Sequence, residues 1–302
     1  MKYSSTRSAL SSKMTFITSE TSRLDPPQVL RPRRSDCKLH MMKFIPITLL
    51  FAAQVASTTF GDPKQHATAT WLASDGAANP DGSIHTVIKM NVDEGWHTYW
   101  KNPGTAGLPV SIEAELPEGW SIGEIGYPVP KRFMTAELPG FGYEGEILYP
   151  VTLTAPEKFE GKLPILNATV SWLTCDDSAC VPGKAVLQLA VGPHQKLIET
   201  AYEALPRAIQ DAKLTFLSAG ESIQLTLTLA EGSEIDPSGF DIFPAIPDII
   251  DPAATPIFSK NPTTPNAWLA TAPKNEYLSD TPEKIVLVLK AKDGISYEVS
   301  SK

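Results

Sequence analysis

Short apolar or alternating runs, separated by clusters of turn-forming residues, restrict the fold of this chain more than any other feature. The runs between Thr68 and Val191 read SIHTVIKMNV, VSIEAEL, ILYPVTLTA, PILNATVSWLTC and KAVLQLAVG. Gly, Pro, Asn and Asp lie between them, and the 27 prolines of the chain disfavour long helices. This pattern predicts an antiparallel β-sandwich or barrel.

The hydrophobic period changes in the next segment, PHQKLIETAYEALPRAIQDA. Apolar residues there recur at three and four positions, at Leu197, Ala201 and Leu205. This spacing predicts one amphipathic helix, which we place at 194–212 and expect to kink or end at Pro206.

Alternation resumes in KLTFLSAGESIQLTLTLAEG and in KIVLVLKAKDGISYEV, where Asp293-Gly294 is predicted to form a hairpin turn. The proline-crowded stretch from 237 to 273 is predicted to form long loops with, at most, short edge strands. The predicted fold class is therefore mainly β. We expect an immunoglobulin-like sandwich at 62–193, a linker helix at 194–212 and a second, smaller β-domain at 213–302, with one larger β-unit as the alternative.

The first 61 residues differ from the rest. Residues 1–40 are rich in Ser, Thr and Arg and show no hydrophobic period. Residues 41–61, MMKFIPITLLFAAQVASTTFG, have a lysine, an apolar stretch and then small residues, which is typical of a secretory signal peptide. We expect translation to begin at Met41 or Met42, with 1–40 a misassigned or disordered extension. An uncleaved signal anchor with a 40-residue cytoplasmic tail is the alternative.

Removal of residues 1–61 leaves 17 basic and 31 acidic residues, a net charge of −14. Such a surface repels nucleic acid and anionic membranes. The exported part keeps two of the three cysteines, Cys175 and Cys180, and loses Cys37. An even pair in an oxidising compartment is expected to form a disulfide.

The two cysteines lie in SWLTCDDSACVPG, five positions apart. In an extended strand that separation is about 16 Å, whereas disulfide-bonded Cα atoms lie within ~7 Å. The chain must therefore reverse between them, and residues 176–179 supply a four-residue hairpin loop of suitable composition. The two cysteines are predicted to face each other across the neck of this hairpin.

Three interpretations of this cysteine spacing compete. The first is a closed zinc site, which needs two further ligands. It is disfavoured because no two of the remaining histidines are spaced as a pair; these are His66, His85, His97 and His194. A structural staple is the second reading, although so short a ring contributes only about 2 kcal/mol in the chain-entropy model. The third reading is a redox pair, because an exposed disulfide in a loop is accessible to another protein's thiol.

Local charge predicts the direction of such an exchange. Asp176 and Asp177 follow Cys175, and the next cationic side chain is Lys184. Neighbouring carboxylates raise thiol pKa values and make the reduced pair a slow nucleophile. A partner's thiolate is therefore expected to attack this disulfide.

Several motifs in order carry a resemblance to a known family. The segments EGWHTYWKNPGTAGLPVSIEAELPEGW, YPVPKRF, GYEGEILYPVTL and VSWLTCDDSACVPG resemble the N-terminal periplasmic domain of the thiol:disulfide interchange protein DsbD and its relatives, over about Ala67 to Val191. The resemblance implies an immunoglobulin-like sandwich in which Cys175 and Cys180 receive electrons from a thioredoxin-like domain and pass them to periplasmic oxidoreductases.

The family also has a cap loop with an aromatic residue that shields the cysteine pair until a partner docks. The corresponding region here offers Phe133, Phe141 and Tyr143 as cap candidates. Longer relatives continue into a membrane domain and a thioredoxin-like domain, and no stretch after Gly61 is long and apolar enough to span a membrane. The resemblance therefore implies a separate membrane electron donor.

The sequence thus predicts a periplasmic or otherwise exported protein that performs thiol-disulfide interchange with thioredoxin-like partners. We expect no cofactor and no metal, with the Cys175–Cys180 disulfide as the redox-active group. A non-catalytic β-sandwich binding module, in which the disulfide is a structural staple, is the alternative.

Overall fold

The computed structural model describes residues 64–75, 79, 81–157, 159 and 161–301. The predicted extension at 1–40 and the predicted signal peptide at 41–61 lie outside the described residues. Within the described part of the chain, no helix combines the length and apolar character needed to cross a membrane.

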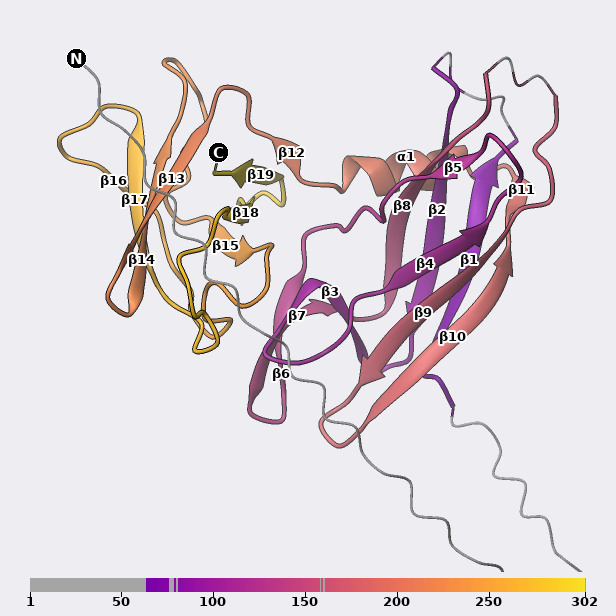
Figure 1. Ribbon diagram of the computed structural model, residues 1–302, viewed down its shortest axis with the longest axis horizontal. Coiled ribbons are helices and arrows are strands. Elements are labelled where there is room, and N and C mark those ends of the chain that lie inside the picture. Colours follow the sequence, from indigo (N-terminus) through magenta and orange to yellow (C-terminus); the bar gives the residue numbers. More distant parts are fainter. Residues whose placement is uncertain (1–63, 76–78, 80, 158, 160, 302) are drawn as a thin grey trace, which may run out of the picture. The chain divides into compact units, whose positions relative to one another are not determined.

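Two β-sheets form the region 64–192, called the N-terminal sandwich below (Figure 1). The first sheet has the order β11-β1-β2-β8-β5, with β11 Ala190–Gly192, β1 Ala67–Ser74, β2 Ser83–Val92, β8 Glu146–Thr154 and β5 Ser121–Ile122. The second has the order β10-β9-β3-β7-β6, with β10 Cys180–Gln188, β9 Asn167–Cys175, β3 His97–Gly104, β7 Leu138–Tyr143 and β6 Lys131–Thr135, and β4 Ser111–Glu115 also pairs with β9. Apart from the parallel β1–β11 pair, the ladders are antiparallel, and the predicted sandwich is confirmed.

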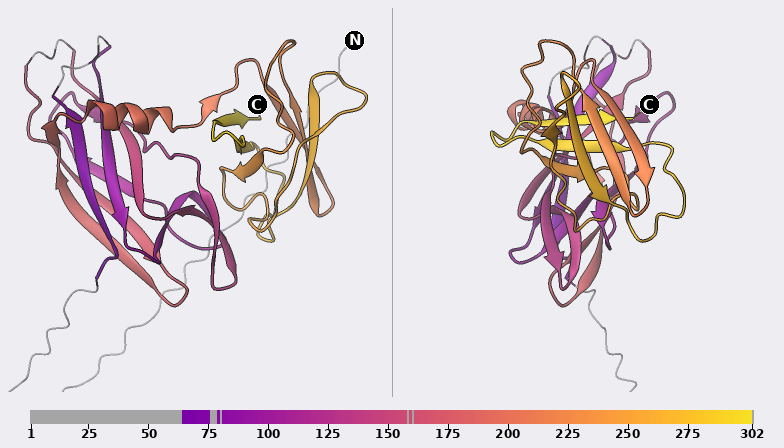
Figure 2. Two further views of the ribbon diagram at one scale, coloured as in Figure 1. Left: turned by 180° about the vertical axis from the view of Figure 1, so that it is seen from behind. Right: turned by 90° about the vertical axis from the view of Figure 1, so that its left-hand side faces the viewer.

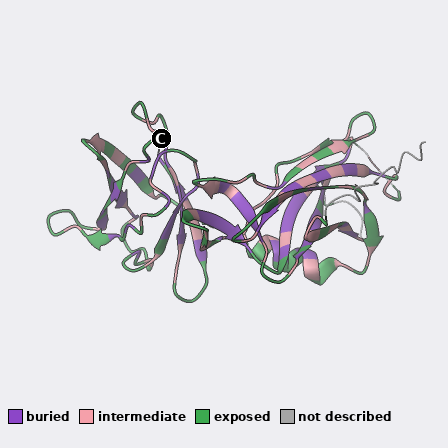
Figure 3. Ribbon diagram, turned by 90° about the horizontal axis from the view of Figure 1, so that it is seen from below, coloured by how far each residue is buried: buried purple, intermediate pink, exposed green. Residues whose placement is uncertain are grey.

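Alternation along the strands builds the core between these sheets. In β9, every second residue from Ala168 to Thr174 is buried, which is the two-residue period expected of a strand with one face inward. Large side chains from both sheets, including Trp71, Trp100 and Tyr149, are fully buried in one cluster. Figure 3 shows buried segments along the strands and exposed residues at the loops.

The helix is shorter than predicted. It spans α1 Gln195–Glu203, ends before Pro206, and is followed by the short strand β12 Arg207–Ala208 instead of continuing to residue 212. Proline cannot donate the backbone hydrogen bond that a further turn requires. The helix buries Ile198 and Ala201 on the first sheet beside β1, β2 and β8, so it covers the sandwich as well as connecting it to the following strands (Figure 2).

Two further sheets form residues 207–301, called the C-terminal β-region below. One has the order β12-β19-β18-β15, with β19 Ser296–Ser300, β18 Val286–Lys290 and β15 Asp241–Pro244. The other has the order β13-β14-β17-β16, with β13 Lys213–Ala219, β14 Ser222–Thr228, β17 Ala267–Pro273 and β16 Ser259–Lys260. The predicted hairpin at 293–294 is present, between β18 and β19.

The prediction that residues 237–273 contain only short edge strands is wrong for the last part of this segment. Strand β17 has seven residues and lies inside its sheet, where it pairs with the whole of β14 and with β16. Its buried residues include three alanines, whose small side chains give a weak hydrophobic signal, and proline occupies only its last position, Pro273.

The C-terminal β-region has its own apolar cluster, which includes Leu225, Phe258 and Leu287. It also contributes residues to the core of the N-terminal sandwich, namely Phe243, Ala245 and Val288. The domain boundaries at 193 and 213 stay a prediction.

Candidate functional site

The two cysteines close a long antiparallel hairpin. Strands β9 and β10 are joined by nine residue pairs, which begin with Cys175 opposite Cys180 and end with Asn167 opposite Gln188. The Cα atoms of the cysteines are 4.1 Å apart, and their sulfurs form a disulfide. The predicted hairpin and the predicted pairing are both present.

Asp176 shapes the loop of this hairpin. Its Oδ1 accepts hydrogen bonds from the backbone N–H of Ser178 at 2.7 Å, from the hydroxyl of Ser178 at 2.8 Å and from the backbone N–H of Ala179 at 2.7 Å. These hydrogen bonds to Ser178 and Ala179 lower the pKa of the Asp176 carboxyl, although slight desolvation opposes them. The carboxylate is therefore ionised at neutral pH and adds negative charge beside the disulfide.

The two cysteines differ in exposure. Cys175 lies inside the sheet, where it pairs with His97 of β3 as well as with Cys180, and its exposed fraction is 0%. Cys180 begins the edge strand β10 and is exposed. An incoming thiol can therefore approach through Cys180.

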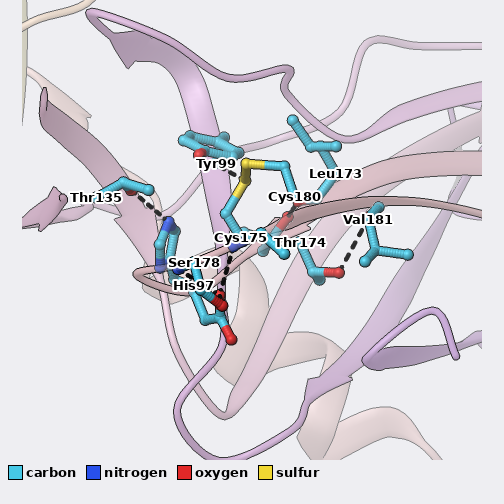
Figure 4. The surroundings of a disulfide bond; sticks show 12 residues. His97, Tyr99, Thr135, Leu173, Thr174, Cys175, Ser178, Cys180 and Val181 are labelled. Atoms are coloured by element: carbon cyan, nitrogen blue, oxygen red, sulfur yellow. Dashed lines mark hydrogen bonds between the residues drawn. A yellow bond between two sulfur atoms is a disulfide. The ribbon is translucent and has the colours of Figure 1, made fainter.

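A tyrosine hydroxyl contacts the buried sulfur. Tyr99 of β3, itself 2% exposed, donates a hydrogen bond from its hydroxyl to Sγ of Cys175 at 3.0 Å (Figure 4). Burial raises the pKa of Tyr99, and a hydrogen bond with Thr135 partly opposes this shift. The phenol stays protonated at neutral pH and can donate to a thiolate as well as to a disulfide sulfur.

His97 completes the buried side of the site. Its Nε2 lies 2.9 Å from Oγ1 of Thr135, with which it shares a hydrogen bond (Figure 4), and its ring lies edge-on to Tyr99 with centroids 5.4 Å apart. Burial lowers the pKa of His97, while the nearby carboxylates of Glu144, Asp177 and Asp176 oppose that effect. We therefore expect a neutral imidazole at pH 7.

The three cap candidates lie on two paired strands, and they have different surroundings. Phe133, on β6, is half-buried, and its ring centroid is 4.0 Å from that of His97 and 5.7 Å from that of Tyr99. Phe141, on β7, is buried against Trp100 and Phe243. The structure thus brings Phe133, but not Phe141, to the surroundings of the disulfide.

Tyr143, the third candidate, is also buried. Its hydroxyl donates to the carbonyl oxygen of Pro128 at 2.7 Å, and its ring packs edge-on against Tyr149. Of the three candidates, Phe133 is therefore the one with ring contacts to the residues around Cys175.

A hollow of about 420 Å³ lies beside the disulfide loop. Its lining includes His97, Phe133, Glu144 and Asp177. Among the described residues, no three His, Cys, Asp or Glu side chains gather in a group that could hold a metal ion.

Sequence reasoning assigned no role to Tyr99 and considered His97 only as a possible metal ligand. Both residues lie on β3, which pairs with β9 at Cys175, and this pairing places them beside the cysteine pair. The sequence alone does not show which strands pair, so it could not identify these two residues.

Residues 68–191 match the family described as thiol:disulfide interchange protein DsbD, N-terminal. The match includes both cysteines and all strands of the N-terminal sandwich, apart from the first residue of β1 and the last residue of β11. This segment is a DsbD N-terminal domain. The predicted resemblance is thereby confirmed, and the disulfide hairpin, Tyr99 and Phe133 all lie within the DsbD N-terminal domain.

Solved structures extend the comparison of folds beyond this domain. The N-terminal periplasmic domain of ScsB from Proteus mirabilis is 19% identical, with a TM-score of 0.58, and the match covers 79% of this chain and 93% of that one. It therefore extends beyond the DsbD N-terminal domain and shows a shared fold. A protein from Porphyromonas gingivalis W83 is 10% identical, with a TM-score of 0.22 and coverage of 78% and 99%. No curated protein sequence matches the chain.

Proposed function

We propose that this protein performs thiol-disulfide interchange through Cys175 and Cys180. The observation that carries the proposal is the asymmetry of the disulfide: Cys180 is exposed, whereas Cys175 is buried and its sulfur accepts a hydrogen bond from Tyr99. The DsbD N-terminal domain around the hairpin supports the same chemistry.

The reaction begins with the thiolate of a partner. It attacks Sγ of Cys180, because this sulfur is the accessible one, and the bond between the two sulfurs breaks as the new bond forms. Cys175 leaves as a thiolate. The hydroxyl of Tyr99 donates to that sulfur, which lowers the pKa of the leaving thiol and speeds its departure.

The second step resolves the mixed disulfide. A second thiolate of the partner attacks the partner's own sulfur, and Cys180 leaves. Two electrons and two protons have then moved from the partner to this protein, so that the partner holds a disulfide and this protein holds two thiols. The reverse sequence passes the electrons to another disulfide.

The charge around the hairpin suits the role of an acceptor that a partner attacks. Asp176 is ionised, and Asp177 lies next to it, so the free thiols of the reduced protein are poor nucleophiles. We infer that the partners are thioredoxin-like oxidoreductases, and that the exchange takes place in the periplasm or another exported location.

The decisive measurement is the reduction potential of the Cys175–Cys180 disulfide in the protein from residue 62 onward. The protein is equilibrated with glutathione, its thiols are alkylated, and the products are read by mass. A value of roughly −180 to −270 mV, the range of thioredoxin-like exchangers, supports interchange. A value below about −300 mV marks a structural disulfide and favours the non-catalytic binding module instead.

Stability after reduction gives an independent test. Because eight of the nine residue pairs of the hairpin lie outside the short disulfide ring, the reduced protein should remain folded and lose little stability. Unfolding of the protein on mild reduction contradicts an interchange role.

A further inference from the structure

Strand β6 presents its two faces to different parts of the molecule. Successive side chains of a strand point to opposite sides. Phe133 and Thr135 lie on one side, where they contact His97. Arg132 lies on the other side and contacts the C-terminal β-region. One strand therefore links that region to the surroundings of the disulfide.

The guanidinium of Arg132 is held by two carbonyl oxygens and two aromatic rings. Nη2 donates to the carbonyl oxygen of Ile242 in β15 at 2.6 Å, and Nη1 donates to that of Pro252 at 3.1 Å. The guanidinium carbon lies 5.0 Å from the ring centroids of both Phe141 and Phe243. A planar, permanently charged group suits this arrangement, and lysine cannot reproduce its forked geometry.

On the opposite face, β6 supports the tyrosine at the buried sulfur. Phe133 packs against His97 and Tyr99, and Thr135 shares a hydrogen bond with His97. Tyr99 in turn donates its hydrogen bond to Sγ of Cys175. Direct contacts therefore connect β6, through His97 and Tyr99, to the sulfur of Cys175.

We propose that Arg132 is a positioning residue for thiol-disulfide interchange. It fixes β6 against the C-terminal β-region and thereby keeps the hydroxyl of Tyr99 on the sulfur of Cys175. The C-terminal β-region then contributes to the chemistry of the disulfide without touching it. This inference rests on the proposed function and adds a role for a region outside the DsbD N-terminal domain.

The test compares the rates at which dithiothreitol reduces the disulfide in four variants. Arg132→Met keeps an apolar stem between the rings and removes both hydrogen bonds. Lys131→Met is the matched control, because it removes an exposed cation from the neighbouring position of β6. Tyr99→Phe removes the hydroxyl that contacts Cys175, and the fourth variant combines Tyr99→Phe with Arg132→Met.

We expect Tyr99→Phe to slow reduction about tenfold, because a donor to the departing thiolate is lost. Arg132→Met should slow it about threefold to tenfold, and Lys131→Met should stay within about twofold of the wild type. In the Tyr99→Phe background, Arg132→Met should add less than about twofold, because the two residues act through one hydrogen bond.

The pKa of the Cys175 thiol in the reduced protein is the second readout. It is followed by the pH dependence of alkylation, and it should rise in Tyr99→Phe and in Arg132→Met but not in Lys131→Met. If Arg132→Met does not fold, Arg132→Lys, which keeps the charge but not the forked geometry, takes its place in the same comparison.

An unchanged or faster reduction of Arg132→Met overturns the inference, as does an effect of equal size in both backgrounds. These outcomes are separate from a failure of the proposed function. A wild-type potential below about −300 mV rejects interchange itself, whereas a potential in the exchanger range with no effect of Arg132→Met rejects only the positioning role.

Discussion

Gly183 of β10 lies directly opposite Trp172 of β9, on the same hairpin as the disulfide. The indole folds over the glycine, and a Cβ atom at position 183 would lie far inside the van der Waals radii of Nε1 and Cε2 of Trp172. Trp172 is 4% exposed and belongs to the core of the N-terminal sandwich. Gly183→Ala therefore forces the indole out of a closely packed site.

Overpacking of a core by one methyl group costs about 1–3 kcal/mol of unfolding free energy. We expect about 3 kcal/mol for Gly183→Ala, because the clash involves three ring atoms of Trp172 and this side chain is almost fully buried in the core. For a protein of this size, that loss lowers the melting temperature by about 6–12 °C. Tryptophan emission should also shift to longer wavelength as the indole of Trp172 meets water.

Urea and thermal unfolding, followed by tryptophan fluorescence, measure both effects. Gly123→Ala is the matched control, since a Cβ atom there makes only ordinary contact, 3.4 Å from the carbonyl oxygen of Thr152. Its stability should stay within about 0.5 kcal/mol of the wild type. Equal stability of Gly183→Ala and Gly123→Ala would refute the reasoning, as would a full Gly183→Ala penalty in a protein that also carries Trp172→Ala.

Three further outcomes follow from buried or ionised groups. Limited alkylation of the reduced protein, mapped by mass, should label Cys180 at least about tenfold faster than Cys175, because only Cys180 is exposed; equal labelling contradicts the assigned point of attack. Asn102→Ala should cost about 1–3 kcal/mol in urea unfolding, since its buried amide donates to the carbonyl oxygen of Pro244 at 2.7 Å; an unchanged midpoint would argue against that contact. Folding lowers the pKa of Asp176, so the stability that this carboxylate contributes is present above its unfolded pKa near 4 and is lost as the pH falls through the folded value. Asp176→Asn should therefore weaken the acid dependence of the urea midpoint. Identical pH profiles of the variant and the wild type would exclude this contribution.

Local patterns predicted the elements that depend on neighbouring residues. The run SIHTVIKMNV coincides with β2, and the composition of residues 176–179 predicted the hairpin loop between the cysteines. In both cases the signal is a two-residue period or a turn composition, which acts within a few positions of the chain. The sandwich and the disulfide were predictable for this reason.

Long-range register was not predictable in the same way. The contact of Tyr99 with Cys175 depends on the pairing of β3 with β9, across 76 positions. The hydrogen bonds of Arg132 to Ile242 and Pro252 depend on how separate sheets pack. Strand β17 was missed because small inward side chains and flanking prolines hid its period. These features follow from tertiary packing, which the local pattern does not encode.

The ladder between β9 and β10 has a consequence for the return reaction. Backbone hydrogen bonds across nine residue pairs hold Cys175 and Cys180 opposite each other, and none of these bonds requires the link between the sulfurs. After reduction, the two thiols therefore stay at a very high effective concentration, in the geometry that a disulfide needs. In the proposed interchange, the reduced protein would therefore re-form its disulfide without a search for the second cysteine.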